Sequence, residues 1–310
     1  YKFEDDEHDA EKSVNAYNTL KDWGMQILMG SVTSNPSIAV SEKTKEDNMF
    51  QITPSGSAVE CIKYDNAFQI CFTDPNQGIA SADYIAANSL ATKIAVIYDS
   101  SDPYSSGIYE KFTSEASTVG LEIVVAEAFT ADNKTDFTVQ IQKAQEAGAE
   151  LVFLPIYYTE ATLILKQANT IGYDPLFFGC DGLDGILDVE GFDTALAEDV
   201  ILLTPFAADA PDELTQNFVA AYKEEFGGIP NQFAADAYDA IYTIKAAIEA
   251  KDVKPDMSVS DICEAMKTAM TEISVVGLTG GGNEMTWEAT GEVSKTPVAV
   301  TIKDGVYTAH

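Results

Sequence analysis

Residues 25–57 read MQILMGSVTSNPSIAVSEKTKEDNMFQITPSGS, and this stretch decides the fold class. A short apolar run ends in glycine and is followed by small polar residues, which is the pattern of a buried parallel strand leading into a helix. Asn35 is a good N-cap, and Pro36 stands where the first helical residue belongs. A second short run, residues 51–53, leads into another polar turn. We therefore predict two neighbouring strands, each with a polar turn at its carboxyl end.

Two such turns side by side are typical of a ligand site in an open α/β sheet, and helix N-termini favour anions. All 18 basic residues of the chain are lysines. A carboxylate could therefore not be held by a bidentate guanidinium, and hydroxyls and helix-terminal N–H groups would have to hold it. The same Ser and Thr residues also serve as ordinary helix caps in many proteins, so the pattern alone leaves both interpretations open.

Length and charge restrict the class of protein. A chain of 310 residues exceeds one typical core, so we expect two α/β lobes. A net charge of −32 would repel nucleic acid and anionic lipid alike. No apolar run reaches the roughly 18 residues of a spanning helix, and the opening residues do not resemble a signal peptide. We expect a soluble mature protein or a truncated one.

Cysteines and histidines give no sign of a metal or cofactor site. Cys61 and Cys71 are near in sequence and are either a local disulfide or two buried thiols. The histidines, His8 and His310, lie at the two ends of the chain, which argues against histidine-based catalysis. The run 280–282 is all glycine but opens no helix, so it is not a nucleotide-binding loop. Four cysteines are too scattered for a metal site: Cys61, Cys71, Cys180 and Cys263.

Strands and helices alternate through most of the chain, which predicts doubly wound parallel sheets with helices on both faces. After a possible strand end at residues 1–4, the predicted strands are 68–72, 93–98, 121–126, 151–156, 175–178 and 200–203. The predicted helices of this part are 9–23, 74–90, one ending near 119, 136–147 and 159–171. Three helices follow without a clear strand between them, and then a hairpin with an Asp-Gly turn: 212–226, 232–250, 259–271 and 298–307.

Seven segments together resemble the type I periplasmic-binding-protein family, in particular its branched-chain amino-acid receptors of ABC transporters. In chain order they are GSVTSNPSIA, ITPSGSA, FTDPNQG, KIAVIYDSSDPYSSG, FLPIYYTEATLILKQA, FFGCDG and MTWEATGEV, and they cover almost the whole chain. The resemblance implies two lobes joined by three crossings, with a ligand cleft between them. Lobe 1 would be residues 1–73 and 205–282, and lobe 2 residues 74–204 and 283–310. The family begins with a further strand and helix that are missing from this numbering, and without them lobe 1 would have an open sheet edge.

The resemblance also implies an amino-acid pocket. Ser34 matches a position that meets the ligand carboxylate, and Asp181, where close relatives carry Glu, matches the acid that pairs with the ammonium group. Each of these residues also has an ordinary structural reading, since most tyrosines lie at a surface and most phenylalanines in a core. The positions carried over are Ser34, Ser55, Ser57, Tyr104, Tyr157, Asp181 and Phe233.

We therefore expect a monomeric, extracytoplasmic receptor without cofactor that captures an α-amino acid by hinge closure and delivers it to a membrane permease. A ligand-sensing domain with the same fold is an alternative. An enzyme is disfavoured, because the chain lacks GxGxxG, a phosphate loop, GxSxG and a usable histidine. Lys63, the lysine nearest the second polar turn, is an alternative partner for a ligand carboxylate.

Overall fold

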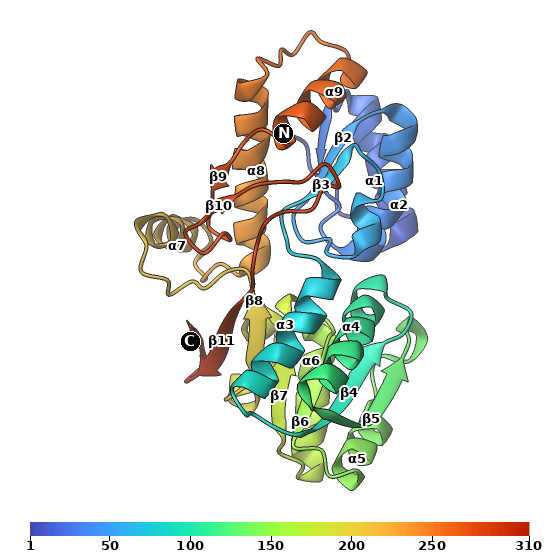
Figure 1. Ribbon diagram of the computed structural model, residues 1–310, viewed down its shortest axis with the longest axis vertical. Coiled ribbons are helices and arrows are strands. Elements are labelled where there is room, and N and C mark those ends of the chain that lie inside the picture. The colour runs from blue at the N-terminus through green and yellow to red at the C-terminus, as the bar shows by residue number, and fades with distance from the viewer. Residues whose placement is uncertain (310) are drawn as a thin grey trace. The chain divides into compact units, whose positions relative to one another are not determined.

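The computed structural model describes residues 1–309, which form two compact units. Unit 1 comprises Tyr1–Thr73 and Phe233–Thr296, and unit 2 comprises Asp74–Gln232 and the chain from Pro297 onward. The chain therefore passes from one unit to the other three times, after Thr73, after Gln232 and after Thr296. Each unit is a sheet covered by helices on both faces, so the α/β class predicted from the sequence is correct (Figure 1).

Unit 1 is built on a three-stranded parallel sheet in the order β1-β2-β3: β1 (Ile27–Met29), β2 (Phe50–Thr53) and β3 (Ala67–Gln69). Leu28 packs with Tyr17 and Val40 beneath α1 and α2, whereas Phe50 and Ile52 belong to the core beneath α8 and α9. The remaining elements of unit 1 are α1 (Ala10–Trp23), α2 (Ser34–Asp47), the 3-10 helix η1 (Val59–Ile62), α8 (Gln232–Ala250), α9 (Val259–Met270), β9 (Val275–Val276) and β10 (Glu284–Met285).

Unit 2 is built on a seven-stranded sheet in the order β12-β11-β8-β7-β6-β4-β5. Its strands are β4 (Lys93–Asp99), β5 (Glu122–Phe129), β6 (Leu151–Leu154), β7 (Leu176–Gly179), β8 (Ile201–Thr204), β11 (Val298–Lys303) and β12 (Val306–Ala309). The first five strands are parallel, and the predicted C-terminal hairpin adds β11 antiparallel to β8. The sequence pattern thus predicted the parallel part and the hairpin but not where the hairpin docks.

Helices cover both faces of the unit 2 sheet. The core beneath α3 and α4 contains Phe112 stacked on Phe153, with ring centroids 4.0 Å apart, and the core beneath α5 and α6 contains Ile97 and Leu154. The helices are α3 (Asp74–Ala87), α4 (Pro103–Val119), α5 (Thr138–Glu146), α6 (Tyr158–Ile171), α7 (Glu213–Phe226), and the 3-10 helices η2 (Ala131–Asn133), η3 (Asp181–Leu183), η4 (Ile186–Asp188) and η5 (Thr194–Ala197).

The second and third crossings differ from those predicted. Residues 205–232, which we had assigned to lobe 1, lie in unit 2. The physical reason is that this segment packs on unit 2, where Ala207 packs against the core cluster that contains Leu202 and Val300. At its end, the backbone N–H of Gln232 donates to Asp184 Oδ2 at 2.8 Å.

Residues 283–296, which we had assigned to lobe 2, lie in unit 1. Trp287 Nε1 donates to the carbonyl oxygen of Gln69 on β3 at 2.8 Å, and the N–H of Gln69 donates to the carbonyl oxygen of Gly291 at 3.1 Å. A Cβ at position 291 would lie 2.3 Å from the carbonyl oxygen of Ala67, so only glycine allows this approach.

Two local predictions in unit 1 are wrong. Helix α2 begins at Ser34 rather than Pro36, because Thr33 takes the extended conformation of an N-cap and accepts the N–H of Ser37 at 3.1 Å. Pro36 is tolerated in this first turn, where an N–H has no helical partner. Residues 1–4 form no strand, because within the described chain they have no neighbouring strand to complete a ladder.

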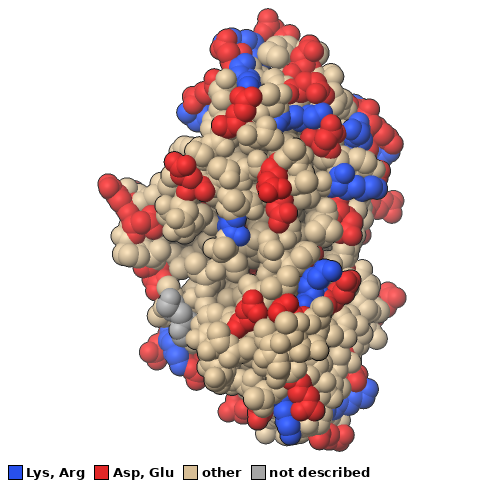
Figure 2. Space-filling view, viewed as in Figure 1, with Lys and Arg blue, Asp and Glu red and all other residues tan. Residues whose placement is uncertain are grey.

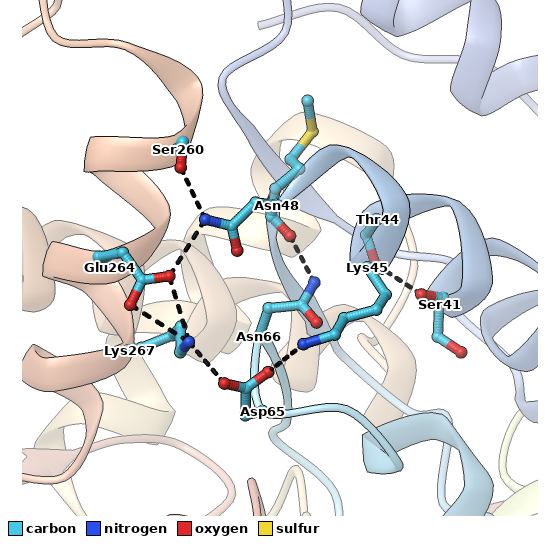
Figure 3. Close-up of polar contacts among 10 residues, drawn as sticks. Ser41, Thr44, Lys45, Asn48, Asp65, Asn66, Ser260, Glu264 and Lys267 are labelled. Atoms are coloured by element: carbon cyan, nitrogen blue, oxygen red, sulfur yellow. Dashed lines mark hydrogen bonds and ion pairs between the residues drawn. The ribbon is translucent and has the colours of Figure 1, made fainter.

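A polar network links α2, α9 and the turn before β3 (Figure 3). Asp65 lies between two lysines, with Lys45 at 2.7 Å and Lys267 at 2.6 Å. Lys267 also contacts Glu264, which accepts a hydrogen bond from Asn48 at 3.1 Å. Asp65 is half exposed, so the network is a surface feature, and its ion pairs are screened by water.

The hydrogen bonds from Lys267 and Lys45 lower the pKa of Asp65 to about 2, against the opposing effect of partial burial. Because the folded-state pKa lies below the ordinary 3.8, the stabilisation is complete above about pH 4 and is lost as the pH falls toward 2. We expect Asp65→Asn to destabilise the protein at pH 5 and to have little effect at pH 2, measured by urea unfolding. Asp132→Asn, which removes an exposed carboxylate in unit 2, serves as the control. Equal effects of Asp65→Asn at both pH values would contradict the assignment.

The chain is strongly acidic, and Figure 2 shows scattered groups of acidic side chains, with lysines near several of them, on a face that is otherwise uncharged. All four cysteines are buried thiols, so of the two alternatives for Cys61 and Cys71 the disulfide is wrong. Within residues 1–309, no helix combines the length and the apolar character needed to cross a bilayer, and no group of residues could hold a metal ion.

Candidate functional site

The two polar turns predicted from the sequence lie together in unit 1. Ser34 is the first residue of α2, and its Oγ accepts the N–H groups of Ser57 and Ala58, both at 3.1 Å. A serine hydroxyl has two acceptor positions and one O–H. Because both acceptor positions of Ser34 are taken by the second turn, its own O–H remains as a donor. The side chain is fully buried and thus fixed in place.

Close packing holds the second turn against the first. The N–H of Ser55 donates to the carbonyl oxygen of Val32 at 3.2 Å. A Cβ at Gly56 would lie 2.6 Å from Thr53 Oγ1 in the same turn and 3.0 Å from Ser37 Oγ on α2, so glycine allows this close packing. Ser57 is fully buried, and its Oγ makes no hydrogen bond to any residue in the described chain. A buried hydroxyl of this kind is available to a ligand.

In the unit 1 cluster of Ser34, Ser55 and Ser57, the hydroxyls of Ser34 and Ser57 therefore present hydrogen-bond donors. The start of α2 adds the backbone N–H groups of Ser34 and Asn35, which have no partner within the helix. Donors at a helix N-terminus suit an anionic group. Lys63, the predicted alternative, is more than half exposed and pairs with Glu42 at 3.2 Å, which turns its charge toward solvent.

A second cluster lies in unit 2. The Tyr104 hydroxyl donates to Asp181 Oδ1 at 2.8 Å and accepts the N–H of Gly182 at 2.9 Å. Asp181 is 2% exposed and Tyr104 is 1% exposed, although Asp181 stands at the start of η3 and Tyr104 in the first turn of α4. The two residues are 77 positions apart in sequence, and the ends of β4 and β7 bring them together. The tyrosine thus orients the carboxylate.

Aromatic packing completes the unit 2 cluster. The partly exposed ring of Tyr157 stacks on Tyr104 with centroids 4.8 Å apart. Burial, and next the charge of Asp181, raise the pKa of Tyr104 well above its ordinary value, so its hydroxyl keeps its proton. A Cβ at Gly182 would lie 2.6 Å from the Tyr104 hydroxyl, which accounts for the glycine beside the acid. The cluster therefore presents one oriented, buried carboxylate beside an aromatic surface.

The structure thus groups six of the predicted site residues into two clusters. The seventh, Phe233, is partly buried near the start of α8, where unit 1 resumes after the second crossing. It belongs to neither cluster by any described hydrogen bond or ring contact. The cluster in unit 1 is Ser34, Ser55 and Ser57, and the cluster in unit 2 is Tyr104, Tyr157 and Asp181.

Sequence reasoning missed two residues that hold these elements. Gln77 is fully buried in the first turn of α3, and its Oε1 accepts the N–H of Asp181 at 3.4 Å. The spacing Asp74 to Gln77 at a helix start was the available signal. Asp184 fixes the first residue of α8, and burial raises the pKa of this carboxyl to about 7. No local pattern distinguishes Asp184 from the other acids of the chain.

The chain thus forms two α/β units joined by three crossings, with a polar cluster at the carboxyl ends of strands in each. The family of periplasmic binding proteins matches residues 1–305. The chain therefore belongs to the periplasmic binding protein family, with the type I fold, and is a non-enzymatic binding receptor.

The chain is similar to several binding proteins of this family. A Leu/Ile/Val-binding protein homolog of Brucella melitensis is 28% identical over 257 residues, which are 80% of this chain and 67% of that protein. A branched-chain amino acid transporter substrate binding protein from Streptococcus pneumoniae, solved with isoleucine, superposes with a TM-score of 0.87 at 23% identity and covers 99% of this chain and 85% of its own. A solute binding protein from R. palustris, solved with benzoate, gives 0.85 at 17% identity, covering 99% and 82%. The chain spans about two thirds of the length of the curated relatives that it matches.

Proposed function

We propose that this protein is the extracytoplasmic receptor of an ABC importer and that it captures an apolar α-amino acid, with leucine, isoleucine and valine as the first candidates. The observation that carries the proposal is that one cluster presents hydrogen-bond donors and the other presents a negatively charged carboxylate. Unit 1 offers hydroxyl and N–H donors around Ser34 and Ser57, and unit 2 offers the buried carboxylate of Asp181. An α-amino acid carries both complementary charges on one carbon atom.

The carboxylate end of the ligand would be held without a cation. Hydrogen bonds from hydroxyls and N–H groups to a charged acceptor are stronger than those between neutral groups, and a helix N-terminus adds a favourable dipole. The ammonium end would pair with Asp181, which Tyr104 already orients. A closing movement of the two units around the ligand is the hinge mechanism that this assignment requires.

Aromatic acids are the second candidate, because a relative with the same fold was solved with benzoate. Benzoate would satisfy the donors of unit 1, and its ring would suit the stacked Tyr104 and Tyr157. It brings no positive charge to the buried carboxylate of Asp181, however, whereas an α-amino acid brings one. We therefore favour the amino acid.

A receptor of an ABC importer needs two partners, its ligand and a membrane permease. One relative is named as a Leu/Ile/Val-binding protein homolog and another was solved with isoleucine, and we propose the same class of ligand here. The released amino acid would pass to a membrane permease, and the receptor would work as a monomer. We expect no nucleic-acid partner, because a net charge of −32 would repel it.

A thermal-shift series tests the proposed ligand. We expect leucine, isoleucine or valine to raise Tm, because a ligand at 100 times its Kd stabilises the folded state by about 2.7 kcal/mol. Benzoate and 4-methylpentanoate, which carry the carboxylate without the ammonium, should give much smaller shifts at the same concentration. A large shift with benzoate and none with any of the twenty amino acids would overturn the proposal.

A further inference from the structure

One lysine of unit 1 is buried. The side chain of Lys295 is 1% exposed, whereas every other lysine side chain described in this unit with an ion pair is 19% exposed or more. Its Nζ lies 3.5 Å from Asp236 Oδ1 and donates to Thr279 Oγ1. Asp236 is itself fully buried. A buried ammonium of this kind is rare unless charged and polar partners surround it.

The contacts continue from Thr279 to a second carboxylate. Thr279 Oγ1 donates to Asp239 Oδ2 at 2.6 Å, and Asp239 also accepts the N–H groups of Leu278 at 2.8 Å and Thr279 at 2.9 Å. A Cβ at Gly277 would lie 2.5 Å from the Asp239 carboxylate, so glycine is required for this approach. We refer to Asp236, Asp239, Thr279 and Lys295 as the Lys295 cluster.

The Lys295 cluster lies where the chain enters and leaves unit 1. Asp236 is the fourth residue after the second crossing, and Lys295 directly precedes Thr296, the last residue before the third crossing. Glu292, in the same segment as Lys295, also lies at the first crossing, because its Oε1 is 3.5 Å from Thr73 Oγ1. One short segment, residues 291–295, therefore contacts the unit 1 ends of the other two crossings.

Stability alone is a weak reason for such a cluster. Removing two carboxylates and an ammonium from water is costly, and apolar side chains of similar volume often stabilise a core as well or better. What the charged groups supply is a defined geometry, since each hydrogen bond fixes a direction as well as a distance. The elements whose geometry is fixed here are the start of α8, the turn 277–279 and residues 291–295.

We propose that Lys295 is a positioning residue that joins the unit 1 ends of the second and third crossings into one rigid body. Glu292, through Thr73, joins the unit 1 end of the first crossing to the same body. In the receptor proposed above, hinge motion then takes place on the unit 2 side of the three crossings, that is, after Thr73, before Phe233 and after Thr296. It does not take place within the segments that the cluster holds. This consequence for closure rests on the proposed function. The rigid body itself does not, because it can be measured in the protein without ligand.

Hydrogen exchange, followed by mass spectrometry, tests the rigid body. In Lys295→Met we expect exchange over residues 277–280 and 291–296 to speed up by about tenfold or more, because the local opening free energy falls. The matched control is Met266→Ala, a fully buried core position on α9 in the same unit. It should lower Tm without selective exchange in these segments. If both variants show the same exchange pattern, or Lys295→Met exchanges like wild type, the proposal is wrong.

A double variant separates positioning from simple charge burial. Lys295→Met removes the ammonium that lies 3.5 Å from Asp236 Oδ1, and Lys295→Met/Asp236→Asn removes the negative charge of the carboxylate as well. We expect the double variant to regain much of the lost Tm and to keep the fast exchange over residues 277–280 and 291–296. Recovery of slow exchange together with Tm would overturn the positioning role.

With leucine as the probe, faster association and dissociation in the double variant would extend the result to closure of the two units, and unchanged rates would refute that extension. If leucine does not bind wild type, the proposed function fails and the exchange result still decides the rigid body.

Discussion

Asp181→Asn is expected to weaken leucine binding by about 2–5 kcal/mol, the usual loss when one partner of a desolvated charge pair is removed. The structure makes this substitution conservative in shape. The Tyr104 hydroxyl, which donates to Asp181 Oδ1 at 2.8 Å, can donate equally to the asparagine oxygen. The loss would therefore report the charge itself, and isothermal calorimetry measures it directly.

The control for Asp181→Asn is a ligand rather than a second variant. 4-Methylpentanoate has the shape and carboxylate of leucine but no ammonium group, so its affinity should change far less. Equal losses for both ligands would show that Asp181 does not meet the ammonium group. Tyr104→Phe should fall between wild type and Asp181→Asn, because it removes the orienting hydrogen bond and keeps the charge.

Ser34→Ala is expected to have the second largest effect on binding, about 1.5–3 kcal/mol, because it removes one hydrogen bond to a charged group and leaves the helix terminus in place. The structure adds a second consequence. The N–H groups of Ser57 and Ala58 would lose their acceptor within a buried turn, at a further cost of about 1–3 kcal/mol in the free energy of unfolding. Calorimetry measures the first effect and urea unfolding the second.

Two variants isolate the role of Ser34. Ser41→Ala removes another buried hydroxyl from α2, which bonds only to the carbonyl oxygen of Ile38 in its own helix. It should change binding little. Lys63→Met tests the opposite view, in which a lysine holds the carboxylate. A collapse of binding in Lys63→Met, with Ser34→Ala close to wild type, would replace the hydroxyl site by a salt bridge.

Local patterns predicted the elements well because each is encoded over a few turns of chain. The apolar run before Gly30 became β1, the three helices after residue 211 became α7, α8 and α9, and Asp304-Gly305 became the hairpin turn. The start of α2 was misjudged by two residues, since Thr33, Asn35 and Pro36 all favour helix starts and only the hydrogen bond from Ser37 to Thr33 selects among them.

The site could be predicted in composition but not in its connections. The hydroxyl-rich turns and Asp181 were recognisable from their places after strands and from the family resemblance. That Ser34 accepts two N–H groups from the second turn could not be predicted, because the choice between a ligand and a protein partner depends on packing between segments 23 residues apart. Lys63 and Lys295 look alike in sequence, yet the side chain of Lys63 is 56% exposed and that of Lys295 is 1% exposed.

The sequence by itself determined the α/β class, the order of strands and helices, the absence of arginine and the acidic charge, because these depend on periodicity and composition. Only the tertiary structure decided where the chain divides, since residues 205–232 and 283–296 carry no local mark of the unit on which they pack. It also decided which polar groups meet. Asp181 finds Tyr104 across 77 residues and Lys295 finds Asp236 across 59, because folding brings distant strand ends and helix starts within hydrogen-bond distance.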